Sequence, residues 1–304
     1  VPTHLPQCNL ISVGDMAGNG SRKVVGQRSI HVEFSFGVQL CCDDPGDAAR
    51  KAIELNSDLG EAHASLGIVY VTNHEGVKGY KELEQALKLT PGYAEALIWF
   101  GWINLILNKP AEAAEAGTQA LRLNPLAPAF RVYLADIYLA NSEYDKALTE
   151  AIRAREINPE YGMAHFMEGL ALYHVGRYED AVKAFQNALE IIPGRGTPNK
   201  AEVKTALAFT HHALGNKQWG LDYKNEIFER IDPFPYGLLQ VLYGELDQAF
   251  STFNRVKDWS SFSTEFIRYF FPNALAPLRN DSRFKKLIEQ VNTSWGLNDD
   301  GSMI

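Results

Sequence analysis

Small apolar residues recur along the chain with a fixed period of 34 positions, set among larger apolar side chains. The first recurring position holds Gly67, Gly101, Ala135 and Gly169. The second holds Gly79, Ala113, Ala147 and Ala181, and the third holds Ala86, Ala120, Ala154 and Ala188. Helices pack closely where small side chains let their backbones approach. The pattern therefore predicts antiparallel helix pairs in four repeats, at 60–93, 94–127, 128–161 and 162–195.

Proline marks the boundary of each period, because it disfavours helix in the residue before it and is accepted in a first helical turn. These boundary residues are Pro91, Pro125, Pro159 and Pro193. Short polar segments such as 108–110, 141–143 and 175–177 connect the two helices of a pair. The fold class that follows is an all-α solenoid.

A helical period of this length, with these small positions, resembles that of the tetratricopeptide repeat (TPR) family. The resemblance implies a right-handed superhelix of antiparallel helix pairs. It also implies that the first helix of each pair lines a concave groove, which is where members of the family bind segments of other proteins.

The repeat pattern divides the chain into three parts. Residues 1–43 do not fit it and form an unassigned N-terminal segment, with a candidate strand at 30–36. The TPR array covers 44–233, with a partial repeat at 44–56 and a degenerate pair at 200–214 and 216–231. Residues 234–304 are expected to form a helical C-terminal cap, because solenoid ends expose core surface. Within this cap we expect helices at 235–243, 245–257 and 281–293, the last capped by Asp281 or Ser282.

Two segments of this cap, 244–250 (GELDQAF) and 277–284 (PLRNDSRF), carry a closer resemblance. They are similar to the C-terminal end of bacterial proteins in which a TPR array follows an adenylate cyclase domain, a winged-helix DNA-binding domain or a similar effector. Ser282 stands where that class usually has proline. Residues 1–43 resemble neither effector, so no effector activity is carried over to this chain.

Composition restricts the partner classes. The 304 residues carry a formal net charge of −8, which argues against nucleic acid as the main partner. The sequence has no apolar run of transmembrane length and no secretory signal pattern, so we expect a cytoplasmic protein without a membrane partner. Three cysteines support neither a disulfide framework nor a zinc site, and we expect no cofactor or metal.

Helical spacing places one set of side chains on the groove face of the first helices. The candidate partner-binding residues are Ile98, Trp99, Trp102, Tyr133, Asp136, Phe166, Leu170 and Tyr173. They lack the Lys, Asn and Arg with which some TPR proteins hold a peptide carboxylate. The set instead predicts a partner segment with apolar or aromatic anchors, because Trp and Tyr are enriched among interface hot spots.

Two alternatives stay open. An apolar face of this size is uncommon on a monomer, so residues 1–43, the C-terminal cap or a second copy of the chain could close it. Ser282 and Lys285 match the Ser-x-x-Lys arrangement of a serine hydrolase, although its partner motifs are absent.

The adjacent His211 and His212 point about 100° apart on a helix and cannot chelate from one face. We therefore expect a non-enzymatic module.

Overall fold

The computed structural model describes residues 45–73, 75–107, 109–191, 200–227, 233–256, 276–278 and 280–294, and every element in these ranges is helical. A single helix, α1 (Pro45–Leu55), precedes the pairs. The paired helices are α2 (Gly60–Thr72) with α3 (Gly76–Leu89), α4 (Ala94–Ile106) with α5 (Pro110–Leu123), α6 (Pro128–Ala140) with α7 (Tyr144–Ile157), α8 (Gly162–His174) with α9 (Tyr178–Ile191), α10 (Lys200–Ala213) with α11 (Lys217–Ile227), and α12 (Pro233–Leu242) with α13 (Leu246–Phe253).

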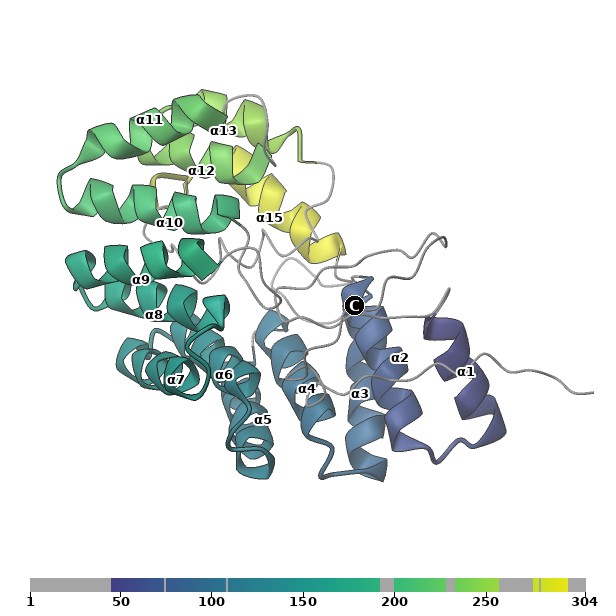
Figure 1. The fold of residues 1–304 in the computed structure, drawn as a ribbon. Helices are drawn as coiled ribbons and strands as arrows, with labels where there is room; N and C mark the ends of the chain where they lie inside the picture. Colours follow the sequence, from purple (N-terminus) through teal and green to yellow (C-terminus); the bar gives the residue numbers. More distant parts are fainter. Residues whose placement is uncertain are drawn as a thin grey trace, which may run out of the picture.

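These helices stack in chain order around an arc (Figure 1), which confirms the predicted all-α solenoid. A short 3-10 helix, η3 (Ala276–Leu278), and the last helix, α15 (Ser282–Ser294), complete the described chain. The predicted cap helices at 235–243, 245–257 and 281–293 correspond to α12, α13 and α15. The candidate strand at 30–36 and the rest of segment 1–43 lie outside the described residues.

In the pairs α2–α3 and α8–α9 the two helices approach so closely that even a methyl group would not fit at the recurring small position. A Cβ built on Gly67 would lie 2.8 Å from Cγ of Leu83, and one on Gly169 would lie 2.5 Å from Cε1 of Phe185. The sequence spacing from the glycine to its partner on the second helix is the same in both pairs. Glycine is therefore required here by space, as the sequence period predicts.

The pair α12–α13 repeats this contact. Gly237 meets the ring of Phe253 at the same sequence spacing, and a Cβ on Gly237 would overlap that ring. The sequence places this pair in the C-terminal cap. Its packing is that of the preceding repeats, and Gly237 stands two periods of 34 residues after Gly169, in phase with the array.

The turn inside each pair has a common backbone form. The N–H of the third residue after the helix bonds back to a carbonyl five residues earlier, as in Arg177 N–H to Leu172 O at 2.9 Å and Glu143 N–H to Tyr138 O at 2.8 Å. This geometry places one residue in the left-handed region. Gly176, Gly215 and Gly244 fill that position with φ of 80°, 81° and 80°. In the pair α6–α7 the same position holds Ser142, with φ of 59°.

One side chain in the first helix of three repeats links its helix to the preceding turn. His63 Nε2 lies 3.0 Å from Ser57 O, Arg131 donates to Pro125 O at 2.8 Å, and His165 Nε2 lies 2.8 Å from Pro159 O. His63 and Arg131 also pair with an acid of the second helix: Glu82 at 2.7 Å and Glu150 at 2.5 Å. In the fourth repeat Ala184 stands where the acid would be.

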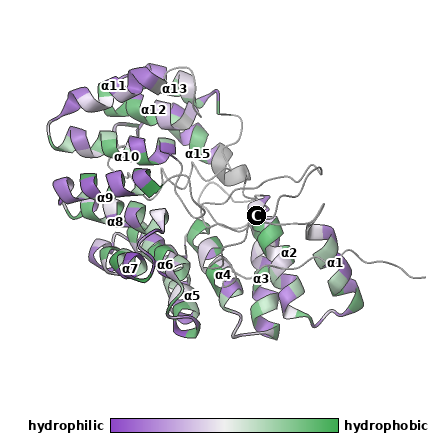
Figure 2. Cartoon of the chain, in the orientation of Figure 1, coloured by the Kyte–Doolittle hydropathy of each residue, from purple (hydrophilic) through white to green (hydrophobic). Residues whose placement is uncertain are grey.

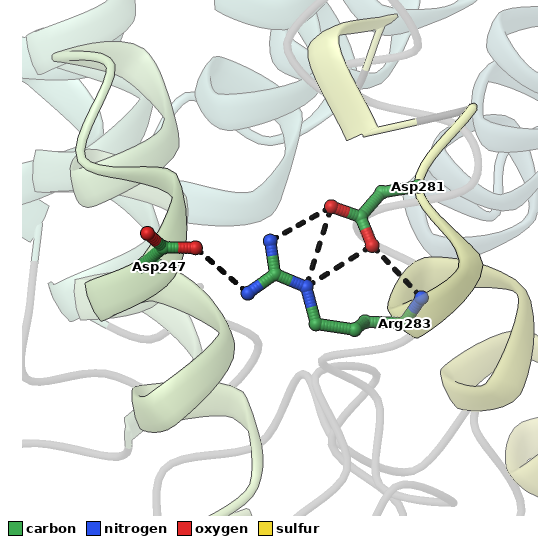
Figure 3. A network of polar contacts seen from close by, with 3 residues as sticks. All are labelled: Asp247, Asp281 and Arg283. Carbon is green, nitrogen blue, oxygen red and sulfur yellow. Dashed lines mark hydrogen bonds and ion pairs between the residues drawn. The ribbon is translucent and has the colours of Figure 1, made fainter.

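The last helix is fixed to the array by Arg283 (Figure 3). Its guanidinium pairs with Asp247 of α13 at 2.8 Å and with Asp281 at 2.8 Å, and it lies 4.0 Å from the centre of the Phe250 ring. Asp281 Oδ1 accepts the backbone N–H of Arg283 at 2.8 Å, so Asp281 is the N-cap of α15. The segments 244–250 and 277–284 thus meet in space at this cluster.

We expect Ser142→Gly to stabilise the chain, because glycine adopts a positive φ without the steric cost of a Cβ. The expected gain in the free energy of unfolding is about 1 kcal/mol, measured from urea denaturation followed by circular dichroism. Gly176→Ala is the matched control and should lower stability by a similar amount. Equal stability of Ser142→Gly and the parent chain would contradict this account of the turn.

Candidate functional site

The candidate partner-binding residues lie on the first helices of three successive pairs. α4 carries Ile98, Trp99 and Trp102, α6 carries Tyr133 and Asp136, and α8 carries Phe166, Leu170 and Tyr173. These first helices are buried over most of their length, whereas the second helices keep exposed polar positions. Figure 2 shows the same contrast further along, with hydrophilic residues on α11 and apolar residues on α12.

Most of the candidate side chains are closed off from solvent. Asp136 is 4% exposed, and Trp99, Trp102, Tyr133, Phe166 and Leu170 are buried as well, while Ile98 and Tyr173 are half-buried. The sequence left open whether this face is open or covered by the chain. In the structure six of the eight side chains are buried, so the eight residues do not form a surface that solvent reaches freely.

The candidate residues belong to two packed clusters. Trp99, Trp102 and Tyr133 join the core formed by α2 to α6, where the two tryptophan rings meet edge-on with centroids 5.7 Å apart. Phe166 and Leu170 join a larger core that extends through α10 and α12 to Leu278 of η3 and Leu287 of α15. Phe166 faces Phe185 of its own pair, with ring centroids 5.8 Å apart. The predicted single face is thus continuous along the chain but divided in its packing.

Asp136 differs from the other buried candidate residues because its side chain carries a carboxyl group. It is buried, and among the residues that the structure describes no hydrogen-bond donor reaches its Oδ1. Burial disfavours the charged carboxylate and raises its pKa to about 7 from an ordinary value of 3.8. Because equivalent positions are one sequence period apart, Asp136 lies in line with Ile68, Trp102 and Leu170. We call these four residues the central row.

Three other buried polar atoms were not anticipated from the sequence. Asn104 donates from Nδ2 to Phe100 O at 2.7 Å, but its Oδ1 meets no donor among the described residues. The Tyr161 hydroxyl and His165 Nδ1 are likewise buried and unpaired within the described ranges. The sequence does mark Asn104 as a buried polar residue, because it is the one amide side chain in the apolar run 96–107.

The remaining candidate chemistry lies outside this face. Ser282 and Lys285 are both exposed on the first turn of α15, which Asp281 caps. His211 stacks on Trp219 at 4.8 Å, whereas His212 meets the edge of Tyr243 at 5.8 Å. The two imidazoles therefore point to different neighbours, as predicted.

Metal-binding and membrane-spanning features are both missing from the described ranges. No group of three or more His, Cys, Asp or Glu residues in them could bind a metal. None of the described helices has the length and apolar content needed to span a bilayer.

The raised pKa of Asp136 makes stability depend on pH. The folded chain keeps this proton up to about pH 7, while the unfolded chain loses it near 3.8. The stabilisation is therefore complete below the unfolded pKa and is lost as the pH rises through the folded pKa. We expect the free energy of unfolding to fall by a few kcal/mol more between pH 5 and pH 8 in the parent chain than in Asp136→Asn.

This prediction is checked by urea denaturation at the two pH values. Asp145→Asn, at an exposed acid on α7, is the matched control and should keep the pH dependence of the parent. The same slope in the parent and in Asp136→Asn would show that the carboxyl is not held neutral by burial.

Comparison with known proteins bears on the repeat region. The tetratricopeptide repeat family model matches residues 81–128, 107–156 and 134–195. Small glutamine-rich tetratricopeptide repeat-containing protein 2 of Mycosarcoma maydis is 36% identical over 81 residues, which are 27% of this chain and 23% of that protein. The CTR9 homolog of Arabidopsis thaliana is 26% identical over 217 residues, which are 65% of this chain and 19% of that protein. The chain thus spans less than a quarter of the length of either relative.

Two solved structures share the fold. PilW, a type IV pilus biogenesis factor, superposes with a TM-score of 0.54 at 18% identity, covering 68% of this chain and 88% of that chain. TTC0263 of Thermus thermophilus, a TPR protein, superposes with a TM-score of 0.51 at 23% identity, covering 61% and 97%. The sequence period, the stacked helix pairs and the matched family model agree that this chain carries tetratricopeptide repeats, over residues 81–195 and within a longer solenoid of the same construction.

Proposed function

We propose that the chain is a non-enzymatic interaction module that receives a partner protein's segment along α4, α6 and α8. TPR proteins generally mediate protein–protein contacts, and a relative matched over 26% of this chain is the co-chaperone sgt12 of Aspergillus fumigatus. The segment would carry apolar or aromatic anchors that pack on Trp102 and Tyr173. Such anchors dominate binding energy at many interfaces.

The observation that carries the proposal is Asp136 in the central row. Its neighbours in the row, Trp102 and Leu170, are apolar and buried, whereas Asp136 is an acid whose Oδ1 has no donor among the described residues. A buried carboxyl without a partner weakens a core. Packing alone therefore does not account for this residue, whereas recognition of a ligand would.

Burial sets a condition on binding. Because Trp102, Asp136 and Leu170 are buried in the unbound chain, a partner's segment would have to displace the groups that now pack against them. Binding would then resemble the exchange of one segment for another. Affinity would then depend on the difference in binding free energy between the partner's segment and the groups that it displaces, not on the full area buried.

The hydrolase alternative is the weaker one. Ser282 and Lys285 are exposed on the capped first turn of α15, and this helix begins in the segment that attaches it to α13. A hydrolase at this site would turn over an activated ester such as p-nitrophenyl acetate, and Ser282→Ala would abolish the turnover. Absence of turnover above background would end this alternative.

A second candidate function has one specific observation in its favour. Six of the eight candidate side chains are buried in the chain as it stands. The face would then be a structural core of a regulatory protein, closed by residues 1–43, by the C-terminal cap or by a second copy in a homodimer, and it would receive no outside segment.

The finer resemblance adds a proposal about context. The segments 244–250 and 277–284 support a place for this array in a cytoplasmic bacterial regulator, where another domain carries the effector activity. The physical support is their meeting at Arg283, which joins Asp247 to Asp281. That contact explains why the two segments would be kept together.

The interaction proposal is tested by selecting random 12-residue peptides displayed on phage against the full chain. We expect Trp102→Ala to weaken the binding of a selected peptide more than tenfold, because it removes a large aromatic contact. Fluorescence anisotropy of the labelled peptide measures the affinity. Trp219→Ala, on α11 and outside the central row, is the matched control. Unchanged affinity in Trp102→Ala and Tyr173→Ala would remove the proposal.

Closure by the chain itself predicts a different result from limited trypsin digestion. If residues 1–43 close the face, the sites at Arg22, Lys23 and Arg28 should resist cleavage in buffer and yield in urea. Cleavage should then increase the fluorescence of the apolar dye ANS. Rapid cleavage without a dye response would contradict closure by this segment. Sedimentation velocity of the parent and Trp102→Asp tests the second copy, since a dimer contact through this face would be lost in the variant.

A further inference from the structure

The central row has one polar member, and its place is in the middle of the array. Ile68 is half-buried, Trp102 and Leu170 are buried, and all three are apolar. Asp136 occupies the same helical position in the third of the four full repeats. The acid is thus the one residue of the row that apolar packing of its neighbours does not favour.

The chemistry of Asp136 is that of an unused acceptor. Nearly all buried polar side-chain atoms in proteins have a hydrogen-bond partner. Oδ1 of Asp136 has none among the described residues, although the side chain is more than nine-tenths buried. A carboxylate accepts strong, charge-assisted bonds from an ammonium or a guanidinium group. The missing partner is therefore a hydrogen-bond donor. A cationic donor would both bond to Oδ1 and neutralise the charge of the ionised carboxylate.

The lysines and arginines of α4, α6, α7 and α8 are committed to acids of the chain, Arg153 of α7 included, which pairs with Glu150. Helix α4 contains no Lys, Arg or His, and the one basic residue of α6, Arg131, pairs with Glu150. On α7, Arg155 pairs with Glu168 of α8, and Lys146 pairs with Glu143. Helix α8 contributes only histidines as basic residues: His165, bonded to Pro159 O, and His174 at its last position.

We propose that the partner segment presents a lysine or arginine to Asp136, flanked by apolar side chains that pack on the neighbouring members of the row. This inference rests on the proposed function and names the partner's chemistry. The row supplies the pattern directly, with Trp102 on one side of the acid and Leu170 on the other. The net charge of −8 favours the approach of a basic segment, but the pairing with Asp136 sets where its cation lies.

The test uses random 12-residue peptides displayed on phage and selected in parallel on the full chain and on its Asp136→Asn and Asp136→Leu variants. Circular dichroism first confirms that each variant keeps its helix content, and the conservative Asn variant guards against misfolding. Asp145→Asn, at an exposed acid, is the matched control. Peptides selected on the parent should share a Lys or Arg between apolar residues, and this enrichment should be lost on both Asp136 variants and kept on Asp145→Asn.

A double-mutant cycle then measures the pair itself. Replacing the selected lysine by norleucine should weaken binding to the parent at least tenfold and leave binding to Asp136→Asn nearly unchanged. Selected peptides with apolar anchors but no basic residue would overturn this inference and leave the interaction proposal standing. Basic enrichment that persists on Asp136→Asn would assign it to overall charge and would overturn the inference as well. Failure to select any peptide on the parent would overturn the interaction proposal, and this inference with it.

Discussion

The close approach of the two helices within each pair is the constraint on which the rest of the structure depends. Gly67 against Leu83, Gly169 against Phe185 and Gly237 against Phe253 leave no space for even one added methyl group without movement of the partner. Each repeat of a solenoid contacts only its neighbours, so the packing inside each pair has to be met locally before the pairs can share a core. This local requirement explains why the small positions keep a strict spacing while the residues on the outer surface vary freely.

The end of the array is closed by a different kind of contact. Leu278 and Leu287 bring η3 and α15 into the apolar core, but the position of α15 is set by Arg283, which lies between Asp247 and Asp281 and over the Phe250 ring. Exposed ion pairs contribute little singly. A guanidinium that also packs on an aromatic ring and follows a capped helix start gains more, because the same side chain makes several contacts at one entropic cost.

The fold could be predicted from the sequence because its main signal is local and periodic. The small positions and the boundary prolines determine the helix pairs at 60–195 without knowledge of any distant contact. The helices α12 and α13 were also anticipated, but their similarity to the repeats was missed, although Gly237 and Gly244 stand two periods of 34 residues after Gly169 and Gly176. The bonds of His63 and Arg131 to both a turn carbonyl and an acid of the second helix were equally hidden, because they recur in alternate repeats.

The candidate site shows the opposite limit. Helical periodicity placed Trp102, Asp136 and Leu170 on one line, and the structure keeps them on the first helices of successive pairs. Periodicity describes direction around a helix and contains nothing about what lies over the face. Burial of this line, and its division between two packed clusters, therefore became visible only in the structure.

Asp136 connects these two levels. A sequence shaped for stability alone would carry an apolar residue at this position, as the other repeats do, because a buried unpartnered carboxyl lowers stability at neutral pH. Departures of this kind, where local rules are broken without a compensating contact, are concentrated at functional sites. The cost is borne by the folded chain at all times, whereas a cation that pairs with Asp136 relieves it only when bound. A residue that is unfavourable in the free protein and favourable in the complex adds to the difference between the two states, and this difference is what determines the specificity of an interaction module.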